Sequence, residues 1–197
     1  AGVSTFGGIP LVKGSKNFMN LQETAAVPLK ELKGSSVTTA DVFAHKGYAY
    51  LGTHRGKMTN EGVRIFDMKD PANPKEVAVI GNDIPGTWQE KVIVRSVSTP
   101  SFKGDIAAIS VQRVDKERYG YEGETSPNGG VVLYDVTNPA SPKKLGFWKT
   151  PSNLPTGTHE FWLTEQNNRL ILLATNYQAK RYKEQGVEVH DFSIVDV

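Results

Sequence analysis

Short runs of alternating residues, separated by Gly and Pro, recur along most of the chain. In the segment 62–67, for example, Val63 and Ile65 alternate with Arg64 and Phe66. A period of two over β-branched and aromatic side chains predicts β-strands rather than helices. The same kind of pattern predicts strands at 37–43, 48–52, 91–97, 105–111, 130–135, 159–164 and 170–175. The chain is therefore predicted to be all-β.

One segment of the chain occurs twice. Its landmarks are a Gly, an Asp, two Pro and a Lys, and each of them reappears 68 positions later. The anchors of this repeat are Gly62, Asp67, Pro71 and Pro74 in the first copy and Gly130, Asp135, Pro139 and Pro142 in the second. The Asp is expected to hydrogen-bond the turn that follows it, and the prolines end the strand because they lack an N–H donor. Each copy is therefore predicted to be a strand, a turn and a second strand.

Two further strands precede each copy, which gives four strands in each repeat. A four-stranded antiparallel meander repeated at this scale predicts a blade of a β-propeller. Three blades are predicted, at about 37–80, 91–148 and 158–197, and residues 1–36 are predicted to form an N-terminal arm or a strand that closes the ring. In the last blade the third strand has two alternative registers, 186–191 and 193–197.

The repeated pattern Gly-[Val/Leu]-x-[Ile/Leu/Val]-x-Asp-x-x-x-Pro-x-x-Pro resembles the LVIVD repeat of bacterial and archaeal surface proteins, over about residues 37–197. The resemblance implies a β-propeller fold and an extracellular or cell-surface location. Three blades are too few to close a ring within one chain, and open blade edges invite pairing with other strands. The expected partners therefore include further blades of the same chain or a homo-oligomer.

Composition excludes several classes of partner. The net charge of +2 gives no reason to expect binding to nucleic acid. No apolar run approaches the length of about 18 residues that a membrane-spanning helix needs, so no membrane span is predicted. The chain has no Cys, which excludes disulfides and thiolate metal sites.

Insertions occur between the second and third strands of all three repeats, at 53–61, 114–129 and 176–185. Insertions at corresponding positions are expected to project from one face, and such a face often binds a partner. The binding residues predicted from aromatic and basic side chains are Tyr119, Tyr121, Tyr177, Arg181 and Tyr182, and the alternative is that these loops are merely solvated. Carboxylates at Asp115, Glu117, Glu122 and Glu124 suit calcium, the one cofactor that the sequence suggests, although their spacing matches no known calcium loop.

No local catalytic motif is present. His45 is expected to be an exposed hairpin residue, and His54 is expected to be solvated at a strand end. His159 opens the first strand of the third repeat, and counting back from the hairpins makes Arg95 its counterpart in the second repeat. Arg95, His159 and Glu160 are therefore the candidate residues for a polar site at the propeller channel.

The sequence favours a non-catalytic extracellular or cell-surface scaffold that binds a protein or a surface polymer through loops on one face. One alternative is an enzyme, a hydrolase or a metal-dependent oxidoreductase, with its site at Arg95, His159 and Glu160. A second alternative is a subunit of a surface fibre or layer that assembles through open blade edges.

Overall fold

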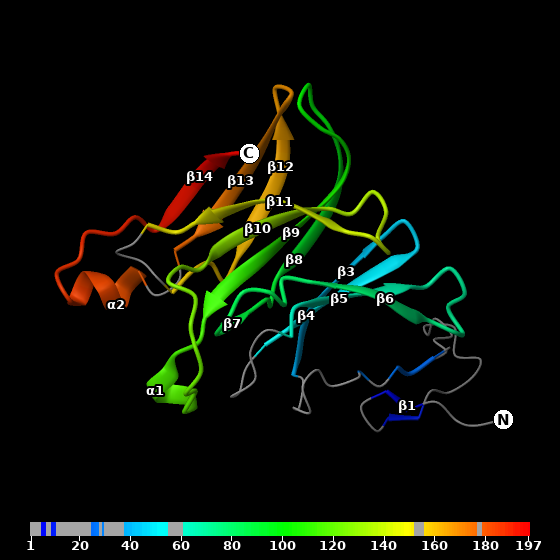
Figure 1. Ribbon diagram of the computed structural model, residues 1–197, viewed down its shortest axis with the longest axis horizontal. Helices are drawn as coiled ribbons and strands as arrows, with labels where there is room; N and C mark the ends of the chain where they lie inside the picture. Colours follow the sequence, from blue (N-terminus) through cyan, green and yellow to red (C-terminus); the bar gives the residue numbers. More distant parts are fainter. Residues whose placement is uncertain are drawn as a thin grey trace.

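The computed structural model describes residues 5–6, 9–10, 25–27, 29, 38–54, 61–151, 156–176 and 179–197. This part of the chain is all-β, with three larger antiparallel sheets that follow one another along the sequence (Figure 1). A short hairpin of β1 (Thr5–Phe6) and β2 (Ile9–Pro10) lies near the N-terminus. The other described residues of the predicted arm, 25–27 and 29, lie against the first sheet.

The first sheet is a four-stranded meander. Its strands, in spatial and sequence order, are β3 (Thr39–His45), β4 (Tyr48–Thr53), β5 (Val63–Asp67) and β6 (Lys75–Ile80). The β3–β4 hairpin turns on Lys46 and Gly47, which both have positive φ. Two such residues match the right-handed twist of the flanking strands, so the turn fixes the register of the hairpin.

The second and third sheets repeat this arrangement. The second contains β8 (Val92–Ser98), β9 (Lys103–Arg113), β10 (Gly130–Asp135) and β11 (Lys143–Lys149), and β7 (Thr87–Trp88) pairs with the end of β9. The third contains β12 (Phe161–Gln166), β13 (Arg169–Thr175) and β14 (Phe192–Asp196). Two short helices, α1 (Lys116–Tyr119) and α2 (Ala179–Glu184), lie within the predicted insertions. Four strands per repeat therefore hold for the first two sheets, whereas the third has three among the described residues.

The third strand of the last sheet takes the later of its two predicted registers. β14 pairs with β13 through Ser193 opposite Ala174, whereas residues 187–190 form no strand. Gly186 has a positive φ of 74° at the end of α2, so it closes a helix and does not open a strand. The Asp of the third repeat is therefore Asp196.

The Asp residues place the three sheets in a common register. Arg64, Val132 and Ser193 each lie three positions before the Asp that ends the strand. The rows of paired residues that pass through them are Val42–Leu51–Arg64, Val92–Ile109–Val132 and Phe161–Ala174–Ser193. Any residue of one sheet can therefore be matched to its counterparts in the other two.

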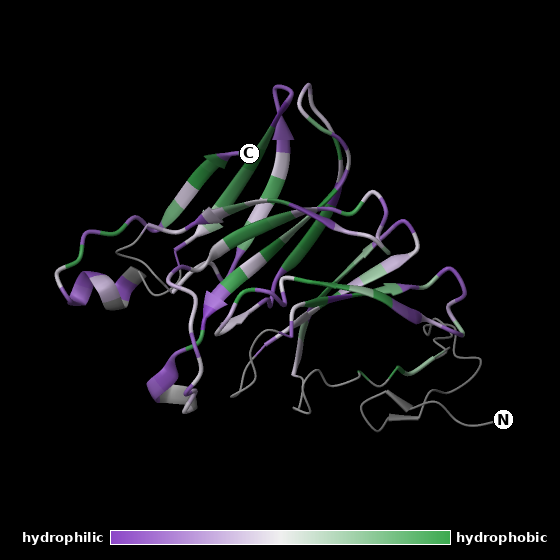
Figure 2. Ribbon diagram, viewed as in Figure 1, coloured by the Kyte–Doolittle hydropathy of each residue, from purple (hydrophilic) through white to green (hydrophobic). Residues whose placement is uncertain are grey.

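Two apolar cores lie between the sheets, and the second sheet contributes to both. Val94 and Ile109 pack toward the first sheet, whereas their neighbours Ile93 and Ala108 pack toward the third. Because successive residues of a strand point to opposite faces, a strand buried on both faces must be apolar throughout. Figure 2 shows hydrophobic colouring over the first part of β8, where Val92, Ile93 and Val94 are buried.

The repeat anchors form turns stabilised by Asp side chains. Asp67 Oδ1 accepts a hydrogen bond from Lys69 N at 2.9 Å, and Asp135 Oδ1 accepts one from Thr137 N at 2.9 Å. These are Asx turns, in which a short carboxylate replaces a backbone acceptor two residues on.

A buried carboxylate joins the first two sheets at their hairpin end. Asp105 on β9 accepts hydrogen bonds from Lys46 Nζ at 2.7 Å and Ser96 Oγ at 2.6 Å, and its Oδ1 lies 3.1 Å from His45 Nε2. The expectation that His45 is simply exposed is therefore wrong, since its side chain is 19% exposed and is bound to the neighbouring sheet. Burial acts to raise the pKa of Asp105, but the hydrogen bonds from Lys46, Ser96 and His45 outweigh it and lower the pKa to about 2.

We expect this depressed pKa to make the protein sensitive to acid. A carboxyl that ionises more readily when folded stabilises the fold above its unfolded pKa of 3.8, and this contribution is lost as the pH falls from there toward 2. The contribution is about 2 kcal/mol. Urea unfolding at neutral pH and at about pH 2 measures how much of the free energy of unfolding is lost in acid. This loss should be smaller in Asp105→Asn than in the wild type. Asp191→Asn, at an exposed position, is the control. If Asp105→Asn loses as much free energy of unfolding in acid as the wild type, the expectation is contradicted.

Candidate functional site

Charged residues meet where the first strands of the three sheets begin. β3, β8 and β12 lie next to one another, and the residue before each matched position is charged in all three sheets (Figure 1). These residues are Asp41, Lys91 and Glu160. Lys91 Nζ lies 3.4 Å from Asp41 Oδ2 and 3.6 Å from Glu160 Oε2, so each sheet contributes one member of a chain of alternating charges.

A second group of polar side chains adjoins this chain and is centred on Glu90. Its Oε2 lies 3.1 Å from His54 Nε2 and 3.1 Å from His159 Nδ1, and it accepts a hydrogen bond from Gln112 Nε2 at 2.9 Å. Gln112 is buried, and its Oε1 lies 3.2 Å from His159 Nδ1. We call Asp41, His54, Glu90, Lys91, Gln112, His159 and Glu160 the polar cluster. It draws on all three sheets and holds three carboxylates, one Lys and two His.

The connector between the first two sheets positions Glu90. Thr53 N donates to Gln89 O at 3.0 Å, and the buried side chain of Gln89 accepts a hydrogen bond from Gly62 N at 3.2 Å. Trp88 packs edge-on against His54, with ring centroids 5.1 Å apart. The connector is thus bonded to the first sheet by backbone and side chain, which fixes the direction of Glu90.

A second tether positions His159. Arg113 N at the end of β9 donates to Thr156 O at 2.9 Å, and Gly157 forms a β-bridge with Gln112. Gly157 has a φ of 92°, and a Cβ there would lie 2.0 Å from Val111 O, so only glycine permits this approach. The chain entering the third sheet therefore passes directly over β9 and brings His159 to Glu90.

The structure separates the residues predicted for a channel site. The counterpart of His159 is Glu90 and not Arg95. The β8–β9 hairpin has a longer turn than the other two hairpins, so counting residues back from the turn leads to a residue too late in β8. Arg95 lies farther along β8, with its guanidinium 5.2 Å from the ring centroid of Trp162. His159 contacts Glu90 and Gln112, and Glu160 contacts Lys91.

The insertions that hold α1 and α2 project from the end of the sheets that carries the polar cluster (Figure 1). Most of the first predicted insertion, residues 55–60, lies outside the described residues. In the second sheet's insertion, Tyr121 Oη donates to Glu124 O at 2.9 Å, and Lys116 Nζ lies 5.9 Å from the Tyr121 ring. Tyr182 is half-buried in α2. Tyr177 and the side chains of Tyr119 and Arg181 lie outside the described residues.

The calcium suggestion gains no geometric support. Within the described ranges, no group of three or more His or acidic side chains is arranged to hold a metal ion, and this includes Asp115, Glu117, Glu122 and Glu124. The same residues contain no helix long and apolar enough to cross a membrane.

Comparison with known proteins gives no relative from which a function could be transferred, so the functional argument rests on the geometry. No model of a known protein family matches the chain, and no curated protein matches its sequence significantly. The expectation that His54 is solvated is wrong, since its side chain is 15% exposed and contacts Glu90 and Trp88. Sequence reasoning also missed Asp41, Glu90, Lys91 and Gln112 as members of the site. A signal for three members was present, since the matched positions 41, 91 and 160 are all charged.

Proposed function

We propose that the three sheets are blades of a β-propeller of the LVIVD type, and that the chain is a non-catalytic extracellular or cell-surface scaffold. Consecutive antiparallel meanders in a common register support the blade assignment, because the two cores among the described residues each lie between sheets that are neighbours in sequence. The scaffold binds a protein partner through the end of the blades that carries the insertions and the polar cluster.

One observation carries this proposal. Matched positions of three sheets bring Asp41, Lys91 and Glu160 into contact at the end from which the insertions project. Binding sites of repeat proteins commonly arise where corresponding positions and insertions gather on one face. An arrangement that needs all three sheets gives a site whose shape depends on the assembled fold.

The charges indicate which partner groups fit. Asp41, Glu90 and Glu160 carry three negative charges against the single positive charge of Lys91, and the exposed Glu122 and Glu124 lie in the neighbouring insertion. Complementary charge steers association and selects partners. The proposed partner therefore presents Lys or Arg side chains to the polar cluster and to Glu122 and Glu124, whereas α2 at the same end carries the exposed Lys180 and Lys183.

The hydrogen bonding of Glu90 supports binding rather than catalysis. His54, Gln112 and His159 come from different elements and all approach the same carboxylate oxygen. An acceptor oxygen that is shared by three elements joins the sheets and rigidifies the face around it. Arg95, which the enzyme alternative places beside His159 and Glu160, instead stacks on Trp162.

Site-specific photo-crosslinking tests the proposed face. A photo-reactive residue is placed at the exposed positions Glu122 and Glu160 on the proposed face, and at Asn168 on the opposite hairpin end as the control. The protein is then irradiated on cells of its source and the adducts are identified by mass spectrometry. We expect one protein to be captured from Glu122 and Glu160 and not from Asn168. Equal capture at both ends, or no protein adduct at all, would contradict the proposal.

Charge reversal gives the quantitative prediction for the captured partner. Glu160→Lys, at a side chain that is 55% exposed, should weaken binding about fivefold, since an exposed charge contact is worth up to about 1 kcal/mol. The matched control is Glu165→Lys, near the far end of β12, the strand that Glu160 directly precedes. Affinity is measured by calorimetry at low and high salt, and the difference between the variants should shrink at high salt. If Glu160→Lys and Glu165→Lys lose the same binding affinity, the partner does not contact Glu160.

A further inference from the structure

The outward face of the first sheet matches a face that the other two sheets bury. In the second sheet, Val92 and Ile109 pack toward the sheet before it, and in the third sheet Phe161 and Ala174 do the same. The common register makes Val42 and Leu51 their counterparts in the first sheet. These residues have no preceding sheet among the described residues, and Val42 is 62% exposed. We call this surface, formed by Val42, Ala49, Leu51, Phe66 and Met68, the leading face. Ala49 and Phe66, and Arg64 in the same row as Leu51, are already buried within the single chain, so Val42, Leu51 and Met68 remain for a partner.

The outward face of the third sheet matches the opposite side of the same interface. The rows Phe43–Tyr50–Ile65 and Ile93–Ala108–Leu133 pack toward the sheet that follows. Their counterpart is the row Trp162–Leu173–Ile194. Trp162 is 51% exposed and Ile194 is 66% exposed, and Phe192 beside them is also exposed. We call this surface the trailing face.

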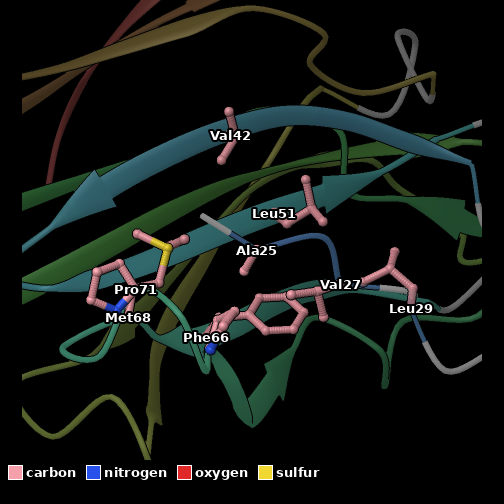
Figure 3. Close-up of a pocket in the computed structure, with 10 residues that line it drawn as sticks. Ala25, Val27, Leu29, Val42, Leu51, Phe66, Met68 and Pro71 are labelled. Atoms are coloured by element: carbon pink, nitrogen blue, oxygen red, sulfur yellow. The ribbon is translucent and has the colours of Figure 1, made fainter. Parts of the chain in front are cut away.

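The leading face has an apolar groove. The segment that contains Ala25, Val27 and Leu29 runs over the sheet, and together they enclose a space of about 340 Å³. Figure 3 shows Val42, Leu51 and the side chains of this segment around the groove. Its lining is made of aliphatic, aromatic, Met and Pro side chains. A surface of this composition is suited to apolar side chains from a partner.

We propose that the trailing face of one copy of this chain packs on the leading face of a second copy, head to tail. The chain already forms this interface twice, between its first and second sheets and between its second and third. The exposed parts of the two outward faces correspond to the two sides of a third such interface, and both are present in the described part of the chain. A second copy of this chain can therefore supply the missing side of each interface. The proposed contact is face-to-face packing of two sheets, and it does not require hydrogen bonding between their edge strands.

The proposed contact is heterologous, because different surfaces of the two copies meet. Heterologous contacts form a ring when the rotation closes and an open chain of molecules when it does not. The contact lies on the outer faces of the terminal sheets and does not depend on the partner-binding face at the polar cluster. Failure of one proposal therefore leaves the other intact.

Complementation between two blocked variants tests the proposal. Ile194→Asp blocks the trailing face and Val42→Asp blocks the leading face, and both positions are exposed in the single chain. We expect the wild type to form species above 21.6 kDa by sedimentation velocity, and each variant to associate at least tenfold more weakly. An equimolar mixture of the variants should form a dimer, because one intact face remains on each molecule. Leu145→Asp, an exposed apolar residue away from both faces, is the control and should associate like the wild type.

Three results would overturn the proposal. The first is a wild type that remains a monomer at millimolar concentration. The second is unchanged association of either folded variant. The third is a mixture of folded variants that stays monomeric, since a contact between two identical faces cannot be rescued by mixing. Circular dichroism verifies the fold, and Ile194→Thr with Val42→Thr replaces any Asp variant that does not fold.

Discussion

Replacing Arg64 with Ala is expected to lower the free energy of unfolding by about 3–5 kcal/mol, the cost of removing one partner from a buried ion pair. Arg64 is fully buried on β5. Its Nη2 lies 3.2 Å from Glu61 Oε2, and its Nη1 lies 3.3 Å from Glu76 Oε2. Glu61 is itself buried, so the substitution leaves a negative charge without its cation in a medium that solvates it poorly.

Urea unfolding of Arg64→Ala measures this loss, with the exposed Lys75→Ala on the neighbouring strand as the control. The double variant Glu61→Gln with Arg64→Met removes both charges and keeps most of the volume. It should lose less stability than the sum of the two single variants, because most of the cost arises from the unpaired charge. A loss below about 1 kcal/mol for Arg64→Ala would show that water reaches the pair.

Gly52→Ala is expected to destabilise the protein by about 3 kcal/mol, at the upper end of overpacking costs. A Cβ at this position would lie 1.9 Å from Glu90 O and 2.9 Å from Gln89 O. The neighbouring Thr53 N donates to Gln89 O at 3.0 Å, so the connector cannot withdraw without breaking this hydrogen bond. Because Glu90 is the centre of the polar cluster, the substitution also displaces the residue that holds His54 and His159.

Gly146→Ala is the matched control for Gly52→Ala, since a Cβ there meets nothing within 4 Å. Its stability should stay within about 0.5 kcal/mol of the wild type. Thermal unfolding compares the two variants, and the imidazole NMR signals of His54 and His159 should shift in Gly52→Ala only. Equal stability of the two variants would mean that the sheets adjust to the extra carbon.

Most of the sheet architecture could be predicted because it is specified locally. The Gly, Asp and Pro anchors set where strands begin and end, and the alternation of side chains sets which residues face the cores. The register of the third repeat was ambiguous because 186–191 and 193–197 both resemble a strand near an Asp. Tertiary packing decides it, since Val195 must reach the second core beside Leu172.

The site was harder to predict because it is assembled from connectors. Glu90 precedes β8 by two residues, and Gln112 lies one residue before the end of β9. Their meeting depends on the close approaches at Gly52 and Gly157, which no local pattern specifies. Arg95 was matched to His159 because the hairpins were assumed to have equal length, whereas the second has four residues, 99–102, between its strands.

The double burial of the second sheet has a consequence for how the molecule loses its structure. Apart from Phe43 on β3, which packs against both cores, the first and third sheets each contribute to one core. When either of these sheets detaches, the remaining pair of sheets therefore keeps a core of its own. The second sheet can unfold only when both cores are lost. Local opening therefore spreads inward from the terminal sheets, and the strands β9 and β10 form the last cooperative unit to open.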